Sequence, residues 1–395
     1  MSHFIRIAVF LKIILLLVSC GESTEKTDTT DAEEQAMIES LRNTPTLQWD
    51  TEQQFYAYQN FGKVYPVRTI SAGTSAHEFT YSAEMLTGLP IRYNGSTGTL
   101  AEFVEEEYVA GMLILRDDEI VYEYYADGIT ASTPWMTFSV AKTVVSLLYG
   151  AAVKDGYIDS LDDPVTNYLP ELEGSAYDDV TIRHVLQMSS GVEWNEDYTD
   201  PESHVSRLDT LTSGASAISY MATLDRVAPP GTAFNYNTGE TNVAGAVLRE
   251  AIGMPLAEYA SERIWKPFGF EQDGNWALLG EDDLEFGGCC ISATLQDYGR
   301  MVRIALRDGV TDNGERILPE NWIQESTQPG AVDNYGYFWW LSEGGSFVAS
   351  GIFGQFMFIH PEEDMAIIIL SYRPEATSGE YSRKRNALVR AVLGS

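Results

Sequence analysis

The order of strand-like and helical segments along the chain predicts an α+β fold. Strand-like patterns extend over about residues 50–138, helical patterns punctuated by Pro and Gly over about 139–295, and strand-like patterns return over about 296–392. This order favours one antiparallel sheet built from both ends of the chain and flanked by helices, with an all-helical subdomain inserted between them. We expect the functional site at the seam between these two parts.

The clearest strand signal is a hairpin ahead of the helical block. Residues 108–115 and 120–125 are apolar runs joined by a charged turn at 116–119, which is typical of two antiparallel strands. The C-terminal segments are predicted as strands at 347–350, 353–359 and 365–370, a turn at 361–364 and a closing helix at 380–392.

Apolar residues at helical spacing support the inserted block. Val140, Val144 and Leu147 fall on one face of a helix, and segments 243–250 and 256–264 show similar patterns. The sequence therefore predicts at least one long helix directly after residue 139 and a helical pair further along.

The first 20 residues have the pattern of an export signal. Arg6 and Lys12 precede an apolar run at 13–18, which is shorter than the about 20 residues that a membrane span needs. Residues 17–20 resemble a bacterial lipobox, in which the cysteine, here Cys20, is lipidated and becomes the mature N-terminus. We therefore expect a lipoprotein signal at 1–20 and a lipid-anchored protein of the bacterial cell envelope, facing the periplasm or the exterior. A cleaved signal peptide and an uncleaved anchor are the alternatives.

Residues 21–45 are acidic and rich in threonine, with a single lysine. A segment of this composition buries little apolar surface, so we expect a flexible tether. The folded domain is then expected over residues 46–392.

The composition limits the possible partners. The 395 residues include 25 Lys and Arg against 58 Asp and Glu, a net charge of −33, and the hydrophobic share of 44% is that of a globular protein. Nucleic acid is excluded as a natural partner because phosphate binding needs clustered cations. Anionic headgroups would also repel the chain. The oligomeric state is not indicated.

No cofactor or metal is indicated by the motifs. The five histidines are scattered without an HExxH pattern, and no phosphate-binding or dinucleotide glycine motif occurs. Cys289 and Cys290 are adjacent, and we expect two small buried residues, with a strained disulfide ring as the alternative.

An SxxK motif, Ser139 to Lys142, is the strongest chemical signal. In a helix that starts near Ser139, Lys142 lies one turn later on the same face, so its amine can reach the serine hydroxyl. Apolar neighbours would lower the pKa of the lysine, as a base for serine requires. A second SxxK at 23–26 lies in the acidic segment, where nothing would desolvate its lysine. In the simplest alternative, Ser139 only caps the helix and Lys142 is solvated.

Two further segments complete a family pattern. Tyr236 lies in the turn-rich segment 229–240, and Gly351 follows Ala349 and Ser350 between strand-like stretches. The order SxxK, Tyr-x-Asn and Lys/His-Thr/Ser-Gly resembles the β-lactamase and penicillin-binding-protein family of serine hydrolases, in its class C and esterase-like branch. The resemblance covers about residues 50–392 and implies a β-lactamase-like fold.

The resemblance also implies roles for individual residues. Ser139 would be the acyl-accepting nucleophile, Lys142 would help to deprotonate it, and Tyr236 would exchange the proton with the leaving group. The backbone N–H groups of Ser139 and Ile352 would hold the oxyanion. Gly351 would let the substrate approach closely.

Two positions depart from the family pattern. Thr238 stands where asparagine is usual, so a hydroxyl replaces an amide near Lys142. Ala349 stands where the family has a lysine or histidine that assists recognition of a substrate carboxylate, as in β-lactams and peptidoglycan peptides. The second departure argues against both as preferred substrates, unless another cation substitutes.

A narrower resemblance concerns the substrate. Segments 192–203, 236–241 and 351–355 look like the 6-aminohexanoate-dimer hydrolase branch, whose members cleave linear amides and short carboxylic esters. It implies that Tyr198 reaches into the site and that Asp209 approaches the amino end of the substrate. Tyr198 could instead simply pack, and Asp209 could be solvated.

These observations together predict a serine hydrolase of amides or short esters. The expected substrate-binding residues are Tyr198, Thr238, Ser350, Gly351 and Asp209. A β-lactamase or D,D-peptidase, and a catalytically silent binding relative, remain the alternative functions.

Overall fold

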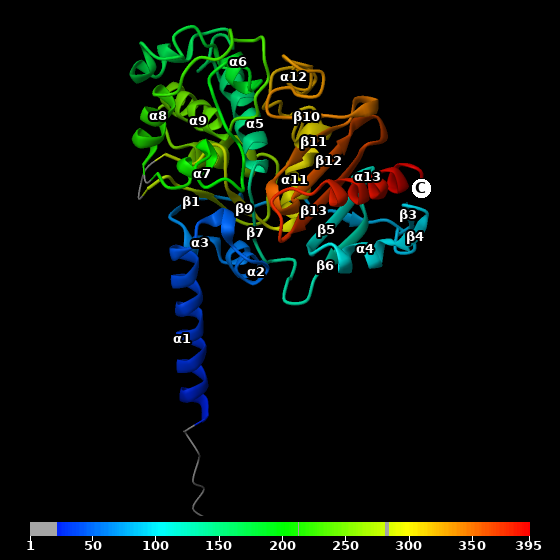
Figure 1. Ribbon diagram of the computed structural model, residues 1–395. Helices are drawn as coiled ribbons and strands as arrows, with labels where there is room; N and C mark the ends of the chain where they lie inside the picture. The colour runs from blue at the N-terminus through cyan, green and yellow to red at the C-terminus, as the bar shows by residue number, and fades with distance from the viewer. Residues whose placement is uncertain (1–21, 212, 281–283) are drawn as a thin grey trace, which may run out of the picture.

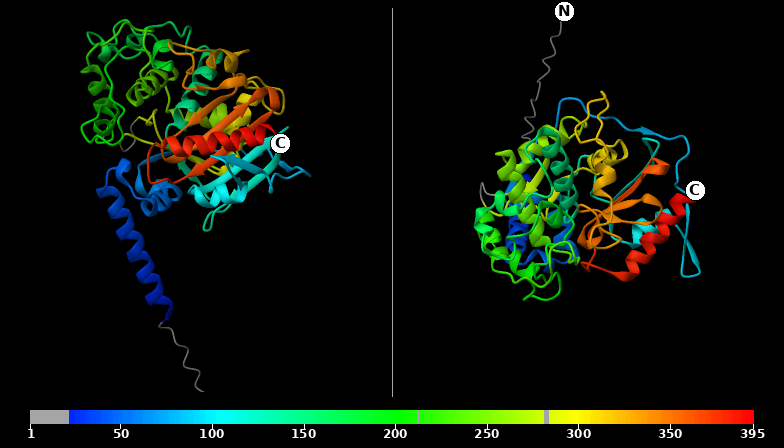
Figure 2. Two further views of the ribbon diagram at one scale, coloured as in Figure 1. Left: turned by 45° about the vertical axis from the view of Figure 1, so that its right-hand side comes forward. Right: turned by 90° about the horizontal axis from the view of Figure 1, so that it is seen from above.

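The computed structural model describes residues 22–395 except 212 and 281–283 (Figure 1). The expected signal sequence and its Cys20 lie outside the described residues. The described chain forms an antiparallel sheet with helices on both faces, next to a largely helical part (Figures 1 and 2). This arrangement confirms the α+β fold predicted from the sequence.

The large sheet is built from both ends of the chain, as predicted. Its N-terminal and C-terminal portions meet where β13 pairs antiparallel with β5, with Ile368 opposite Leu113. The predicted hairpin is β5–β6, and only the short β2 joins its neighbour in parallel. In spatial order the strands are β10 (Trp340–Leu341), β11 (Phe347–Ser350), β12 (Phe356–His360), β13 (Met365–Ser371), β5 (Val109–Arg116), β6 (Glu119–Tyr125) and β2 (Thr80–Tyr81).

The two faces of this sheet are covered by different helices. On β5, Leu113 belongs to the core cluster that includes α11 (Leu295–Leu306), whereas Met112 belongs to the cluster that includes α13 (Gly379–Leu393). This alternation follows from the two-residue period of a strand. A Cβ at Gly111 would lie 3.3 Å from the Leu295 side chain, so glycine allows α11 to pack closely.

A second, smaller sheet was not predicted. Its strands lie in the order β1 (Val67–Ile70), β8 (Gly274–Ala277), β9 (Ile291–Ala293) and β7 (Trp135–Thr137), all antiparallel. Two of them, β8 and β9, fall in the block 139–295 that was expected to be helical. Strands of only three or four residues are too short to show a recognisable periodicity.

The helical part contains most of the residues between β7 and β9. Tyr149 on α5 donates a hydrogen bond to the carbonyl oxygen of Ala244 on α9, at 2.7 Å, which ties the two longest helices of this part together. Its helices are α5 (Val140–Asp155), α6 (Ile182–Leu186), α7 (His204–Leu208), α8 (Gly214–Ala222), α9 (Thr238–Ile252) and α10 (Leu256–Ala260).

Further helices and one hairpin lie in segments expected to be strand-like. They are α2 (Thr51–Gln59), α3 (Phe61–Val64), α4 (Leu100–Glu106) and α12 (Trp322–Ser326), with the hairpin β3 (Pro90–Tyr93) and β4 (Ser96–Thr99). The strand-like character of residues 50–138 is therefore confined to fewer segments than expected.

The expectation of a flexible tether at 21–45 is wrong, because Glu22–Asn43 forms helix α1. Its C-terminal part packs on the domain, where Ile38 and Leu41 are buried. The indole N–H of Trp49 also donates to the carbonyl oxygens of Leu41 (3.3 Å) and Thr44 (3.0 Å). Burial of these apolar residues, which are spaced as on one face of a helix, stabilises the helix despite the acidic composition of the segment. Figure 1 shows the N-terminal part of α1 extending away from the body. None of the helices in the described ranges is long and apolar enough to cross a bilayer.

Leu41→Ala is expected to lower the free energy of unfolding by about 2–4 kcal/mol, because it opens a cavity beside the buried indole of Trp49. Chemical denaturation followed by tryptophan fluorescence would measure the change. The matched control is Glu39→Ala, which alters an exposed residue of the same helix. Equal stability of the two variants would show that α1 does not belong to the folded core.

Candidate active site

Ser139 lies where the small sheet meets the helical part. It lies two residues after the end of β7 and is the N-cap residue of α5. Because β7 pairs with β9, with Thr137 opposite Ile291, the serine is placed beside the turn that precedes β9. Its hydroxyl also lies at the N-terminal end of a 16-residue helix, where the helix dipole favours negative charge.

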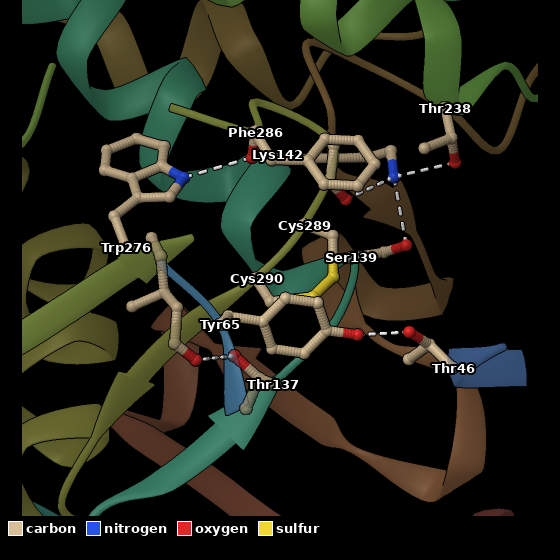
Figure 3. Close-up of a disulfide and its surroundings, with 12 residues drawn as sticks. Thr46, Tyr65, Thr137, Ser139, Lys142, Thr238, Trp276, Phe286, Cys289 and Cys290 are labelled. Atoms are coloured by element: carbon tan, nitrogen blue, oxygen red, sulfur yellow. Dashed lines mark hydrogen bonds between the residues drawn. A yellow bond between two sulfur atoms is a disulfide. The ribbon is translucent and has the colours of Figure 1, made fainter. Parts of the chain in front are cut away.

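Lys142 is buried and held by three neutral acceptors. Its Nζ donates to Ser139 Oγ at 3.0 Å, to Thr238 Oγ1 at 3.1 Å and to the carbonyl oxygen of Gly288 at 2.9 Å (Figure 3). Only 1% of the lysine surface is exposed. Burial lowers its pKa to about 8, and the negative charge of Glu196 opposes that change. An unprotonated fraction of about a tenth is thus present at neutral pH, far more than for a solvated lysine.

Tyr236 completes the cluster. It shares a hydrogen bond with Ser139, and its ring centroid lies 5.2 Å from Lys142 Nζ. The indole of Trp340 stacks on the phenol ring at 5.4 Å with an interplanar angle of 18°. Burial, and then the charge of Glu196, raise the pKa of Tyr236, while the Ser139 hydrogen bond lowers it. The tyrosine is therefore a neutral phenol at physiological pH, suited to pass a proton rather than to act as a phenolate.

Glu196 is the central residue that sequence reasoning missed. Its carboxylate accepts hydrogen bonds from the backbone N–H of Thr238 (3.0 Å), from the Thr238 hydroxyl, from the indole of Trp194 and from the Tyr198 hydroxyl (3.0 Å). It lies within segment 192–203, but as one of 58 acidic residues it carried no distinguishing signal.

The contact with Glu196 also explains Thr238. A hydroxyl has one proton to give, and here the proton goes to Glu196, which leaves an oxygen lone pair to accept from Lys142. Threonine can therefore replace the usual asparagine as an acceptor for the lysine, provided that a carboxylate accepts the proton of the threonine hydroxyl.

The segment after β11 lies directly beside Ser139. A Cβ at Gly351 would lie 2.8 Å from the Gln355 side-chain oxygen and 3.4 Å from the backbone nitrogen of Phe138, so only glycine fits without displacement. The next residue, Ile352, lines the same cavities as Ser139. The two residues named for the oxyanion site are thus brought together.

Two cavities adjoin Ser139. The first, called here the apolar cavity, has a volume of about 440 Å³. Its walls include Phe138, Leu208, Phe286, Tyr198, Thr238 and Asp209. Asp209 lines this cavity; the residue as a whole is exposed, but burial of its carboxyl group raises the pKa to about 6, and a backbone hydrogen bond with Thr46 opposes that change.

The second, called here the polar cavity, has a volume of about 350 Å³. Its walls include Tyr236, Glu196, Trp340, Ser350, Gly351 and Arg385. Ser139, Tyr198 and Ile352 border both cavities, whereas Tyr236 lines only the polar one.

Cys289 and Cys290 are joined by a disulfide, which corrects the expectation of two unbridged cysteines. Figure 3 shows this bridge between Tyr65 and the Ser139–Lys142 pair. Both cysteines line the apolar cavity, and they directly follow Gly288, whose carbonyl oxygen binds Lys142. Across the ranges that the structure describes, no group of three or more His, Cys, Asp or Glu residues could hold a metal ion.

A serine hydrogen-bonded to a buried lysine and a tyrosine, between an antiparallel sheet and a helical part, is the arrangement of hydrolases that use an SxxK motif. The chain belongs to the beta-lactamase family, whose sequence model matches residues 98–391, well over half of its length.

Among curated relatives, the 6-aminohexanoate-dimer hydrolase of Paenarthrobacter ureafaciens is 27% identical over 364 residues, which cover 86% of this chain and 88% of the relative. A beta-lactamase of Yersinia enterocolitica is 25% identical over 178 residues, 43% of each protein. The chain is therefore a hydrolase of the beta-lactamase family that is similar to a 6-aminohexanoate-dimer hydrolase.

Solved structures support the same fold. A Bacillus anthracis protein, provisionally described as a 6-aminohexanoate-dimer hydrolase, superposes with a TM-score of 0.78 at 23% identity, over 88% of this chain and 96% of its own. A class C beta-lactamase from Rhodobacter sphaeroides superposes with a TM-score of 0.56 at 15% identity, over 74% and 97% of the two chains.

Glu196→Gln is expected to lower the pKa of Lys142 further below about 8, because the negative charge that opposes the effect of burial is removed. NMR titration of selectively labelled lysine side chains would measure this pKa. Glu193→Gln removes the same charge from a nearby exposed position and should leave the pKa unchanged. An unchanged or higher Lys142 pKa in the Glu196 variant would contradict the electrostatic link.

Proposed function

We propose that this protein is a serine hydrolase that cleaves linear amides or short carboxylic esters through an acyl-enzyme on Ser139. The observation that carries the proposal is the buried Lys142, whose Nζ lies 3.0 Å from Ser139 Oγ and whose pKa is lowered to about 8. A lysine in this state can accept the serine proton, which an ordinary solvated lysine cannot do at neutral pH.

In the proposed first half-reaction, unprotonated Lys142 takes the hydroxyl proton as Ser139 Oγ attacks the carbonyl carbon. The carbonyl oxygen becomes an oxyanion and accepts hydrogen bonds from the N–H groups of Ser139 and Ile352. Tyr236 donates its proton to the leaving nitrogen or oxygen as that bond breaks, and it regains a proton from Lys142.

The second half-reaction reverses these roles. Water, deprotonated through Tyr236 and Lys142, attacks the acyl carbon, and the proton returns to Ser139 Oγ as the acid product leaves. The chain needs no cofactor for either step, and its partner is a small-molecule amide or ester.

Support for the substrate class comes from the apolar cavity and from the curated relative. An apolar acyl chain suits walls such as Phe138, Leu208 and Phe286, and Asp209, which lines the same cavity, suits a terminal amino group. The relative that is 27% identical is named for hydrolysis of the 6-aminohexanoate dimer, a linear amide.

A β-lactamase or D,D-peptidase is the second candidate, favoured by the partial match to a curated beta-lactamase. Against it, Ala349 is 2% exposed and packed in the core, so this position supplies no cation for a substrate carboxylate. A catalytically silent relative would not need Ser139 and Lys142 within hydrogen-bond distance.

We also propose that a lipid on Cys20 anchors the protein in the bacterial cell envelope, facing the periplasm or the exterior. The apolar run and lipobox-like residues 17–20 support this location. Mass spectrometry of the mature N-terminus would test it: an unmodified Met1 or Cys20 would overturn the proposal.

Ser139→Ala is expected to abolish the burst of p-nitrophenol from p-nitrophenyl butyrate and to lower kcat by about 10³-fold or more, because no acyl-enzyme can form. Stopped-flow absorbance would measure both quantities. The second SxxK motif offers the matched control, Ser23→Ala, which should behave as wild type. A fluorophosphonate label on any residue but Ser139 would refute the site, and faster turnover of nitrocefin than of esters and linear amides would favour the second candidate.

The rate constant kcat/KM for a neutral ester should rise with pH and level off above an apparent pKa of about 8. Only the unprotonated form of Lys142 can accept the serine proton, so activity is lost as pH falls through this value. A pH–rate profile would measure it. A profile that falls with increasing pH over this range would contradict Lys142 as the base.

A further inference from the structure

The disulfide between Cys289 and Cys290 has no part in the proposed mechanism, yet it lies beside the reacting groups (Figure 3). Cys289 directly follows Gly288 in the chain. The carbonyl oxygen of Gly288 accepts a hydrogen bond from Lys142 Nζ at 2.9 Å. The disulfide is therefore one residue away from an acceptor of the proposed base.

The disulfide can be reached from the apolar cavity. Both cysteines belong to the hydrophobic core, with 9% and 5% of their surfaces exposed. Both also line the apolar cavity next to Ser139, whose volume of about 440 Å³ is that of a site for small molecules. A reagent small enough to enter this cavity can therefore meet the sulfur atoms, which are otherwise covered by protein.

The backbone around the disulfide is held in place. The N–H of Cys289 donates to the carbonyl oxygen of Phe286 at 3.1 Å. The carbonyl oxygen of Cys290 accepts from the N–H of Ala277 on β8 at 2.9 Å. A Cβ at Gly288 would lie 2.6 Å from a side chain on α9, so the preceding residue is closely packed as well. The open space beside the sulfur atoms is thus the apolar cavity.

Reduction of the disulfide would disturb the site, because the two sulfur atoms must then move apart. Unbonded sulfur atoms lie about 1.5 Å or more farther apart than bonded ones. Since the backbone is held, the movement either places a thiol in the apolar cavity or draws the Gly288 carbonyl oxygen away from Lys142 Nζ. The first change takes space from the acyl group, and the second removes one of the three acceptors of the base.

We infer that the Cys289–Cys290 disulfide is a reversible modification site within the active site, where reduction by a dithiol that enters the apolar cavity lowers the activity. This inference rests on the proposed function. In an oxidising cell envelope the disulfide would stay intact and the enzyme active.

The chemical step is thiol–disulfide exchange. One thiolate of the dithiol attacks a cysteine sulfur, and the S–S bond breaks to give a mixed disulfide and one free cysteine thiolate. The second thiolate of the dithiol then displaces the other cysteine. The reagent leaves as a disulfide, two electrons have passed to the protein, and protonation gives two cysteine thiols.

Dithiothreitol is the probe that tests the inference. Treatment of the folded full-length protein should lower kcat/KM for p-nitrophenyl butyrate by about 10- to 100-fold, as loss of a hydrogen bond to a charged group does. The reagent is removed without air before the assay, because free thiols cleave the ester themselves. Re-oxidation should restore the activity.

Alkylation with iodoacetamide, followed by mass spectrometry, would show whether Cys289 and Cys290 are reduced in the assayed sample. Alkylation of both cysteines without loss of activity would overturn the inference. Failure of dithiothreitol to reduce them in the folded protein would overturn it too.

The matched control is the double variant Cys289→Ala, Cys290→Ala, which has neither the disulfide nor the thiols. Dithiothreitol should leave the activity of this variant, whatever its level, unchanged. Cys20, the only other cysteine in the sequence, is present in both proteins. An equal loss of activity in wild type and in the double variant would overturn the inference.

A measurement on wild type guards against a double variant that fails to fold and does not depend on turnover. The NMR signal of the Lys142 side chain, assigned by its absence in Lys142→Ala, should shift on reduction and return on oxidation. The signal of Lys154, an exposed residue of the same helix, should not move. An unchanged Lys142 signal in the reduced protein would overturn the inference.

The two proposals can fail separately. If wild type hydrolyses neither esters nor linear amides while its disulfide is intact, the proposed function fails. If it hydrolyses them equally well before and after reduction, only the present inference fails.

Discussion

The site depends on keeping the amino group of Lys142 buried with no carboxylate hydrogen-bonded directly to it. Lys142 Nζ has three neutral oxygen acceptors. The carboxylate of Glu196 influences the pKa of the lysine but is hydrogen-bonded to the Thr238 hydroxyl, which lies between them. A carboxylate bonded directly to the amine would stabilise the ammonium form and remove the base, whereas no charge nearby would leave the amine too weakly basic. Because the Thr238 hydroxyl separates Lys142 from Glu196, the lysine pKa lies between these two extremes.

Three distant parts of the chain must converge to supply those acceptors, and glycines allow it. A Cβ at Gly287 would lie 2.2 Å from the carbonyl oxygen of Thr241, and one at Gly288 would lie 2.6 Å from the Thr238 methyl group. The turn before β9 therefore packs directly on the first turn of α9. This contact brings the Gly288 carbonyl and the Thr238 hydroxyl to the same nitrogen, next to the helix that begins after Ser139.

The sequence predicted the parts of the site that belong to short motifs, and missed those that depend on contacts between segments. Ser139 and Lys142 are one helical turn apart, so their proximity follows from local geometry, and Tyr236 joined them through the motif order. Other features can be recognised only from the residues that surround them in the folded structure. These are Glu196, Arg385 and the short strands β8 and β9. Helix α1 was missed because acidic composition outweighed the apolar spacing of Ile38 and Leu41.

The length of helix α1 bears on how an acidic protein can be anchored at a membrane. Its 22 residues span about 33 Å, and the portion ahead of the buried Ile38 spans about 24 Å. With the anchor proposed for Cys20, this portion would act as a spacer about three Debye lengths long at physiological salt, where one length is about 8 Å. The folded domain, with its excess of carboxylates, would then lie too far from the anionic headgroups to be strongly repelled by them. Its negative charge would therefore be compatible with anchoring at a membrane.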